Sequence, residues 1–312
     1  MPGGSMRIDE NLLYEFESGL NPQDPKNSPV AATIIGYGEI SAIFQIGDNS
    51  EVAFKRLPFF PDRPAAEKYS RQHDEYCHLL TDAGLSLPEH QTIIIEPAGR
   101  PVAVYIAQKN LSSECFGHRL IHEFDADNIY LLIKTIVTEI SKIWHYNRDH
   151  RPAIELALDG QLSNWVWFNT QPHPSIYYID TSTPLFRKEG IETLDPELFL
   201  KSAPGFLRWI LRLLFLKDVI NRYYDKRQVF IDLAANLYKE QRPELIPVAV
   251  DIINGRLEAD QDPLTDEEIK KYYREDRIIW SLYLTFRRID RWLTTKIWGR
   301  RYEYILPGKI KR

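Results

Sequence analysis

Cysteine is scarce in this chain of 312 residues, because Cys77 and Cys115 are the only two. Two cysteines cannot build a disulfide framework or a cysteine zinc cluster, and so few of them fit a reducing cytosol. The first residues lack the basic and apolar regions of a secretory signal peptide. His118 and His122 stand one helical turn apart, but no third ligand is near, so we expect surface residues on a short helix.

Strong net charge is also missing, since the formal charge is −5 and indicates no general affinity for nucleic acid. The most apolar stretch, 205–224, is interrupted by Arg208, Arg212 and Lys217, so it does not predict a membrane-spanning helix. A core helix of a second lobe explains the stretch better than a helix on a membrane surface. With 44% hydrophobic residues the chain can bury a full core, which we expect to be divided into two lobes.

Two acids and an amide, Asp159, Asn164 and Asp180, have the order that a phosphoryl-transfer site needs. One carboxylate can orient an attacking hydroxyl, while the amide and the second carboxylate hold Mg²⁺ against nucleotide phosphates. Taken singly, each has a plain explanation as a turn, an Asx-turn or a helix cap. The order of parts upstream decides between these interpretations.

Upstream lies a glycine-containing hairpin, in which Gly36 and Gly38 allow a sharp turn and bring backbone N–H groups close to phosphates. A third strand, 52–55, then ends at Lys55, whose cation would point back under the hairpin. A dinucleotide fingerprint would run from strand to glycines to helix. Here β-branched and aromatic residues follow the glycines, which excludes that interpretation.

This ordered set resembles the protein-kinase-like superfamily, closer to the small-molecule kinases (aminoglycoside phosphotransferases and choline kinases) than to protein kinases. The resemblance covers 34–184 and implies ATP and Mg²⁺ as cofactors. It assigns Lys55 to the nucleotide phosphates, Asp159 to catalysis, and Asn164 and Asp180 to the metal. The remaining nucleotide contacts that it implies are the glycine loop, a helix glutamate beside Lys55 and an adenine-binding hinge: Gly36, Tyr37, Gly38, Glu39, Ser41, Glu75 (with Glu67 the weaker choice), Gln108, Lys109 and Asn110.

The chain departs from the family pattern at three places. Ala157 and Leu158 precede the catalytic Asp where the family has a His or a basic residue, and Thr181 and Ser182 follow the metal Asp in place of Phe and Gly. No A-P-E segment is evident. These departures argue against a regulated protein kinase and leave open a nucleotide-binding scaffold without catalysis.

The expected fold is α+β and bilobal: an irregular segment 1–29, an N-lobe 30–107 with a small antiparallel sheet and one helix, and a mainly helical C-lobe 108–312. Apolar periodicity predicts helices over 62–84 and 127–147, and strands over 92–95, 102–106, 165–168 and 175–179. After Pro184 we expect only helices.

The last segment of the chain is rich in basic and aromatic residues. After Phe286 only Asp290 and Glu303 oppose the basic residues, and four aromatic residues are interleaved with them. An anionic partner, either a membrane surface or a nucleic acid, would suit this pattern, and solvated arginines on a packed helix explain it equally well. The basic residues are Arg287, Arg288, Arg291, Lys296, Arg300, Arg301, Lys309, Lys311 and Arg312.

We therefore expect an ATP- and Mg²⁺-dependent phosphotransferase that acts on a hydroxyl of an unidentified small-molecule acceptor in the cytoplasm. The alternatives are the inactive scaffold and a peripheral binder of anionic surfaces that uses the basic tail.

Overall fold

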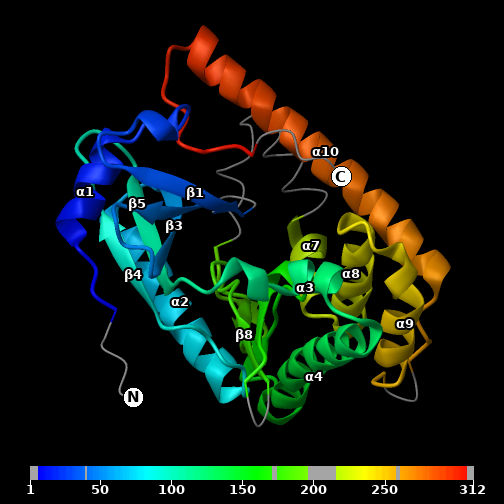
Figure 1. The fold of residues 1–312 in the computed structure, drawn as a ribbon. Coiled ribbons are helices and arrows are strands. Elements are labelled where there is room, and N and C mark those ends of the chain that lie inside the picture. The colour runs from blue at the N-terminus through cyan, green and yellow to red at the C-terminus, as the bar shows by residue number, and fades with distance from the viewer. Residues whose placement is uncertain (1–5, 39–40, 171–173, 196–215, 258–260, 308–312) are drawn as a thin grey trace.

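The computed structural model describes residues 6–38, 41–170, 174–195, 216–257 and 261–307, with only the backbone described for 216–219. The chain is an α+β protein in which an antiparallel sheet with two helices precedes a mainly helical part. Figure 1 shows the sheet on the left and the helices on the right, with the green strands between them. The expected order of a sheet followed by helices is confirmed.

The main sheet has five strands in the order β1-β2-β3-β5-β4, and all neighbours are antiparallel. Both hairpins expected from turn residues are present. Two strands run past their expected ends, because β3 and β5 pair along their whole length, so that β3 extends to Phe60 and β5 to Lys109. The strands are β1 (Ala32–Tyr37), β2 (Ala42–Ile46), β3 (Val52–Phe60), β4 (His90–Ile95) and β5 (Val102–Lys109).

Part of the N-terminal segment is helical, which corrects the expectation that 1–29 is irregular. Helix α1 (Glu10–Gly19) begins at Asp9, whose carboxylate accepts hydrogen bonds from two backbone N–H groups of the first turn. Its buried Leu13 and Phe16 pack on one face of the sheet, with the Phe16 ring 5.2 Å from that of Phe44. A short 3-10 turn, η1 (Pro25–Asn27), leads to β1.

Helix α2 (Arg63–Asp82) confirms the helix predicted after Asp62, which caps it through the N–H of Ala65. Gly84 follows with a φ of +90°, a backbone conformation that glycine adopts without strain. The buried face of α2 carries polar side chains as well as apolar ones: Tyr69, His73, Tyr76, Cys77 and Leu80. These side chains reach the segment 157–182, which carries the predicted catalytic loop and metal ligand.

The helical part surrounds one large core that includes the inner face of α4 (Ala126–His150), as the 3.6-residue stripe predicts. Helix α8 (Lys226–Lys239) is buried on almost every side, so it forms the centre of this part. Around these two helices lie α3 (Gly117–Glu123), α7 (Leu216–Tyr223) and α9 (Ile246–Asn254), with the 3-10 turns η2 (Ser113–Cys115) and η4 (Pro243–Leu245). Most of the apolar stretch 205–224 lies outside the described residues.

Short strands connect the two parts. The predicted hairpin is confirmed as β7 (Trp165–Phe168) and β8 (Ser175–Tyr178), preceded by the turn η3 (Leu162–Asn164). A second small sheet pairs β6 (Ile154–Leu156) with β9 (Phe186–Lys188), and β9 with β10 (Ile191–Glu192). The expectation of helices only after Pro184 is therefore wrong, because Phe186 and its neighbours pair with β6.

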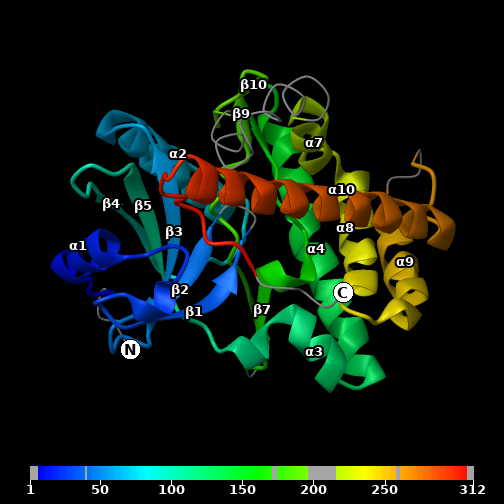
Figure 2. The ribbon, with the colours of Figure 1, turned by 90° about the horizontal axis from the view of Figure 1, so that it is seen from above.

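The last helix, α10 (Asp266–Trp292), lies along the outside of the molecule and ends in the π-helical turn η5 (Leu293–Ile297). Figure 2 shows it crossing from the helical part to the sheet. The segment that follows returns to the sheet, where the Glu303 backbone carbonyl accepts a hydrogen bond of 2.8 Å from Arg56 of β3. Among the described helices, none combines the length and hydropathy needed to cross a bilayer.

Candidate functional site

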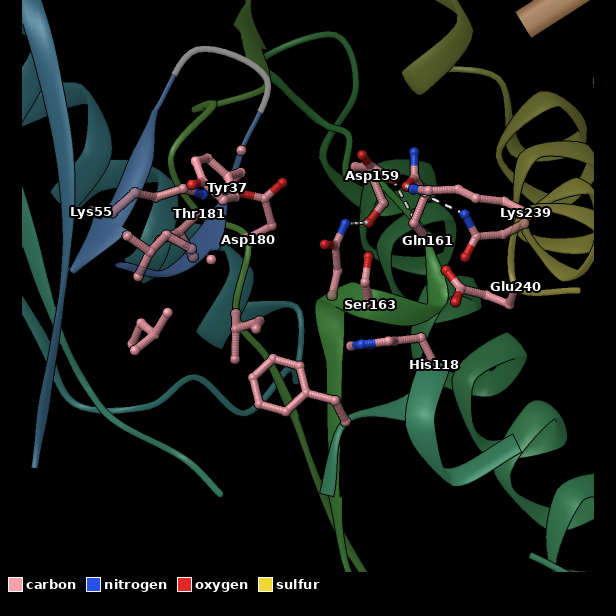
Figure 3. A pocket seen from close by; sticks show the side chains of 18 of the residues that line it. Tyr37, Lys55, His118, Asp159, Gln161, Ser163, Asp180, Thr181, Lys239 and Glu240 are labelled. Carbon is pink, nitrogen blue, oxygen red and sulfur yellow. Dashed lines mark hydrogen bonds and ion pairs between the residues drawn. The ribbon is translucent and has the colours of Figure 1, made fainter. Parts of the chain in front are cut away.

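A cleft of about 530 Å³ lies between the sheet and the helical part. Figure 3 shows Tyr37, Lys55 and Asp180 on its sheet side and Asp159, Gln161 and Lys239 on its helical side. Most of the predicted site residues line it: Gly36, Tyr37, Gly38, Lys55, Gln108, Lys109, Asn110, Asp159, Asn164 and Asp180. Glu39 lies outside the described residues. Neither Ser41 nor Glu75 belongs to the lining.

Lys55 and Asp180, which are 125 residues apart in the chain, form an ion pair in this cleft. The Lys55 Nζ lies 2.6 Å from the Asp180 Oδ1, which also accepts a hydrogen bond of 3.0 Å from the Ser182 hydroxyl. Burial acts to raise the pKa of the Asp180 carboxyl, but the Lys55 ammonium and the Ser182 hydroxyl hold it below its usual range. The cleft therefore holds an ionised carboxylate beside a cation.

The loop that carries Asp159 is fixed by hydrogen bonds within itself. The Gln161 N–H donates to the Asp159 carboxylate (3.0 Å), and the Asn164 side-chain N–H₂ donates to the Asp159 carbonyl (3.1 Å). Asn164 also accepts the Ile179 N–H at its backbone carbonyl (3.0 Å), so the loop is joined to the strand that ends beside Asp180. The segment from Asp159 to Asn164 thus forms a closed turn. Because the Asn164 side-chain N–H₂ is used within this turn, its amide oxygen is the group that can bind a cation.

Asp159 and Asp180 line the same cleft. Burial, with the neighbouring Tyr76 and the negative charges of Asp180 and Asp159, raises the pKa of the Tyr178 phenol well above its usual value. The Tyr178 phenol therefore stays protonated beneath the two acids.

The glycine hairpin approaches the cleft closely. A side chain at Gly38 would meet the Ser41 Oγ at 2.5 Å and would lie 3.6 Å from the Lys55 Cε. The Gly38 N–H donates to the Ser41 carbonyl (3.1 Å), so Ser41 closes the turn and its buried side chain supports the hairpin from behind. We read Ser41 as a residue that shapes the loop, which differs from the nucleotide contact predicted for it.

The predicted hinge is the end of strand β5. The backbone N–H groups of Lys109 and Asn110 donate to the carbonyls of Glu89 (2.8 Å) and Glu51 (2.7 Å). An adenine at this place must therefore use other groups of the segment. Gln108 has a further role, because its side-chain N–H₂ donates to the Ile179 carbonyl (3.4 Å) next to Asp180.

The predicted pair of Lys55 with Glu75 is not formed, which corrects the assignment of that helix glutamate. Glu75 pairs with Lys188 of β9, with Nζ to Oε1 at 2.6 Å, and the weaker choice, Glu67, pairs with Arg63 at the surface. The reason is helical phase: position 75 lies about 100° around the helix from the buried Tyr76. His73, on the buried face of α2, is fully buried and contacts Thr181 of the cleft lining.

Helix α2 supports the segments where the chain departs from the kinase pattern. The Tyr76 hydroxyl donates to the Ala157 carbonyl (2.7 Å), and the His73 Nε2 lies 3.0 Å from the Thr181 Oγ1. The Tyr69 hydroxyl donates to the Ser182 carbonyl (2.7 Å). Burial lowers the pKa of His73, so its imidazole is neutral at neutral pH. Side chains of α2 therefore hold in place both segments at which the sequence departs from the kinase pattern.

The end of the cleft away from Lys55 was missed by the sequence reasoning. The Tyr272 hydroxyl lies 3.1 Å from the Asp232 Oδ1, and both side chains line the cleft with Tyr273, Asp276 and Trp280. Burial, together with the nearby Asp276, raises the pKa of Asp232 to about 6. The one signal in the sequence that could have predicted this part of the site is Asp232 itself, an acid within the apolar run of α8.

A second cation, Lys239, stands beside the Asp159 loop. Its Nζ lies 3.0 Å from the Gln161 Oε1, which also accepts a hydrogen bond from Asn236 (3.3 Å). His118 and His122 lie on the short helix α3, as expected; His122 is exposed, whereas His118 is half-buried and lines the same side of the cleft. Burial and nearby positive charge lower the pKa of His118 to about 4, so it is neutral at neutral pH.

The residues present fit Mg²⁺ held in part by a nucleotide. Within the described ranges, no cluster of three or more His, Cys, Asp or Glu side chains could hold a metal alone. Mg²⁺ is often bound by one or two protein oxygens together with substrate phosphates. The Asp180 carboxylate and the Asn164 amide oxygen, which line one cleft, are a donor set of that kind.

The basic tail is partly internal. Arg287 is buried, with its guanidinium 5.2 Å from the centre of the Tyr304 ring, and Arg301 pairs with Glu303 at 2.7 Å. These two arginines therefore hold the C-terminal segment in place. Lys309, Lys311 and Arg312 lie outside the described residues.

Comparison with known proteins gives a family but no activity. No curated protein matches the chain. A solved structure described as WaaP in complex with acyl carrier protein is similar over 70% of this chain and 89% of that chain, with 12% identity and a TM-score of 0.33, which is too low to carry an argument. A family model described as "Family of unknown function (DUF6206)" matches residues 23–291. Because the match spans most of its length, this chain belongs to the DUF6206 family.

Proposed function

We propose that this protein transfers the terminal phosphoryl group of ATP to a hydroxyl of a small molecule. The observation that carries the proposal is the meeting of Lys55 and Asp180 at 2.6 Å in a cleft that Asp159 and Asn164 also line. A lysine, two carboxylates and an amide in one cleft are the parts that phosphoryl transfer requires. The two parts of the fold on either side would be the lobes of a kinase-like architecture.

The sheet side of the cleft would hold the nucleotide. Lys55 would contact its phosphates, and the hairpin around Gly36 and Gly38 would cover them. Asn164 and Asp180 would hold Mg²⁺, which when bound neutralises part of the negative charge of the phosphates. Asp180 would release Lys55 to the phosphates as it turns to the metal.

Asp159 would orient the acceptor. In the transfer step the acceptor oxygen bonds to the terminal phosphorus, the bond from that phosphorus to the bridging oxygen of ADP breaks, and the acceptor proton passes to the Asp159 carboxylate. Lys239, held beside Asp159 by Gln161, would add positive charge on the acceptor side. The acceptor itself would lie against Asp232, Tyr272 and Trp280 at the far end of the cleft.

A scaffold that binds nucleotide without catalysis is the second candidate, favoured by Thr181 and Ser182 after the metal Asp. The anchors from α2 weigh against it, because Tyr76 and Tyr69 hold the two departing segments in defined positions. Both candidates share the nucleotide site and differ in turnover. The basic residues after Phe286 give a third candidate, a binder of anionic surfaces.

Turnover separates the candidates. Purified protein with Mg²⁺ and ATP should form ADP with at least one acceptor in a screen of sugars, aminoglycosides, choline-like alcohols and lipids. Asp159→Asn should lower the rate by about 100-fold or more while ATP still binds. Lys134→Ala, on the far surface of α4, is the control and should keep the rate. Binding of ATP without turnover on any acceptor, with Asp159→Asn indistinguishable from the parent, would support the scaffold.

A further inference from the structure

Helix α10 exposes an apolar face on the side opposite to the one that it packs against the protein. Its inner face carries the buried Ile269 and Arg287 and the cleft residues Tyr272 and Tyr273. Besides Ile279 (44% exposed) at the flank of this face, four exposed apolar residues recur at steps of four, seven and three, which places them on one face of the helix. They are Ile278 (59% exposed), Leu282 (51%), Ile289 (42%) and Trp292 (55%).

The apolar face continues past the end of the helix. Ile297 and Trp298 are 58% and 57% exposed, respectively, in the turn that follows Trp292. Single exposed apolar residues are common in proteins, but a continuous row of large ones marks a surface that binds something. We call these six residues, Ile278, Leu282, Ile289, Trp292, Ile297 and Trp298, the outer row.

Positive charge accompanies the outer row. Two pairs of arginines at helical spacing follow one edge of the same face: Arg274 with Arg277, and further along the helix Arg288 with Arg291. Between 274 and 300 the basic residues outside the core outnumber the acids Glu275, Asp276 and Asp290. The basic residues are Arg274, Arg277, Arg288, Arg291, Lys296 and Arg300.

We propose that the outer row and its basic edge dock the protein on an anionic lipid bilayer, with α10 lying in the plane of the membrane. A helix that lies in the interface needs an apolar face to enter the headgroup region and basic residues beside it. Trp292 and Trp298 end the row, and tryptophan favours the boundary between headgroups and acyl chains. Basic residues near the surface add about 1 kcal/mol each when the lipids are anionic.

Two other occupants fit this face less well. A second copy of the chain would bring the two basic edges close together, where like charges repel. A nucleic acid would be attracted by the arginines, but the exposed isoleucines and leucine contribute nothing to contacts with phosphates. A bilayer uses both the apolar and the basic part of the surface.

The position of α10 suits this role. Figure 2 shows the helix on the outside of the molecule, across both parts of the fold. The same helix contributes Tyr272 and Trp280 to the cleft from its inner face. Docking therefore needs no rearrangement of the cleft, and the membrane would lie behind the wall formed by α10.

Vesicle co-sedimentation of the full chain, without nucleotide, tests the proposal. The protein should sediment with vesicles of phosphatidylglycerol and phosphatidylcholine, and much less with phosphatidylcholine alone or at high salt. Leu282→Ser combined with Trp292→Ser should lower the affinity for the vesicles by about 100-fold, because two apolar side chains that would be buried in the bilayer are lost. The control, Ile191→Ser, removes an even more exposed apolar residue (72%) from β10 and should leave binding unchanged.

A second pair of variants tests the basic edge. Arg274→Glu with Arg277→Glu should abolish the preference for phosphatidylglycerol, while Lys134→Glu on α4 should retain it. Circular dichroism should show that every variant is folded, since the substituted side chains are exposed. If the double variant is not folded, the milder Ile278→Ser replaces it. Binding that is absent in the parent, or equal in the outer-row variant, overturns the proposal. So does a dimer in light scattering that Leu282→Ser and Trp292→Ser dissociate.

Discussion

Asp232 is the residue at which stability and function oppose each other most clearly. It lies in the middle of the buried helix α8, and burial with the nearby Asp276 raises the pKa of its carboxyl to about 6. A carboxyl that is costly to ionise inside a protein is retained where its charge or its proton serves a ligand. Its place in the lining of the cleft supports such a role.

Asp232→Asn should therefore stabilise the protein at neutral pH. The folded protein binds the Asp232 proton more tightly than the unfolded chain, so this contribution is fully present below pH about 4 and is lost as the pH rises through about 6. Urea unfolding should show a gain for the variant of up to about 3 kcal/mol at pH 8 and almost none at pH 4. Asp276→Asn should give part of this gain. A gain that is independent of pH would contradict the assigned cause.

The ion pair of Lys55 and Asp180 orders the site before any ligand binds. The Lys55 ammonium keeps the buried Asp180 carboxyl ionised, and in the proposed reaction each group would exchange its partner for a phosphate or a metal ion. The site is thus charged and ordered in advance, which reduces the reorganisation that catalysis would require.

At the scale of elements, α2 is the support of the site. Three of its side chains hold segments of the site. Tyr69 and Tyr76 bind the backbone carbonyls of Ser182 and Ala157, and His73 binds the Thr181 hydroxyl. All three lie on the buried face of the helix. A change on this face should therefore alter the geometry of the Asp159 loop without touching a residue that lines the cleft.

Tyr76→Phe tests this support. The variant leaves the buried Ala157 carbonyl without its donor, so the free energy of unfolding should fall by about 1–3 kcal/mol. Because the Asp159 loop loses an anchor while Lys55 and the glycine hairpin are untouched, kcat should fall with little change in the KM for ATP. Tyr69→Phe is the matched control: it releases Ser182 beside Asp180, so it should change the dependence on Mg²⁺. Equal effects of both variants on every parameter would contradict separate roles.

The parts of the site that sequence predicts well are those set by local rules. Turn residues and strand periodicity locate the hairpin of Gly36 and Gly38 and the strand that ends near Lys55, and the order of Asp159, Asn164 and Asp180 marks the opposite wall. Glu75 was misplaced because the flank of an apolar stripe does not tell which side of a helix faces a neighbour. Asp232 and Tyr272 meet from helices 40 residues apart, and local spacing carries no signal of that contact.

The N-terminal helix and the β9 strand were missed for similar reasons. Helix α1 is short, and it is stabilised by packing of Leu13 and Phe16 on the sheet rather than by its own propensity. Strand β9 has three residues, and its pairing with β6 joins positions about 30 residues apart. Both depend on tertiary contacts that only the folded chain supplies.

At the scale of the whole molecule, a buried charge network joins the two ends of the chain to the sheet. Arg56 of β3 lies 2.6 Å from the Glu17 carboxylate of α1 and 3.2 Å from that of Glu303 near the C-terminus. Arg100 and the Tyr105 hydroxyl complete the contacts of Glu17. Burial acts to raise the pKa of Glu17, but the two arginines and the hydroxyl hold it below its usual range.

Glu17→Gln should destabilise the whole protein. The amide leaves the buried guanidinium of Arg56 without its main counter-charge, which costs about 3–5 kcal/mol in comparable buried pairs. Urea unfolding at neutral pH should show this loss. The control is Glu67→Gln, which breaks the exposed pair with Arg63 and should cost less than about 0.5 kcal/mol. Similar losses in the two variants would show that the network does not hold the termini to the sheet.

The central claim is that one triphosphate and its Mg²⁺ occupy the space between Lys55 and Asp180. Calorimetric titration of ATP into the parent, Lys55→Met and Asp180→Asn, each with Mg²⁺ or with EDTA, tests it most directly. We expect ATP to bind the parent more tightly with Mg²⁺, Lys55→Met to weaken binding about tenfold or more, and Asp180→Asn to remove the effect of Mg²⁺. ATP that does not bind, or that binds all three proteins equally, would contradict the account.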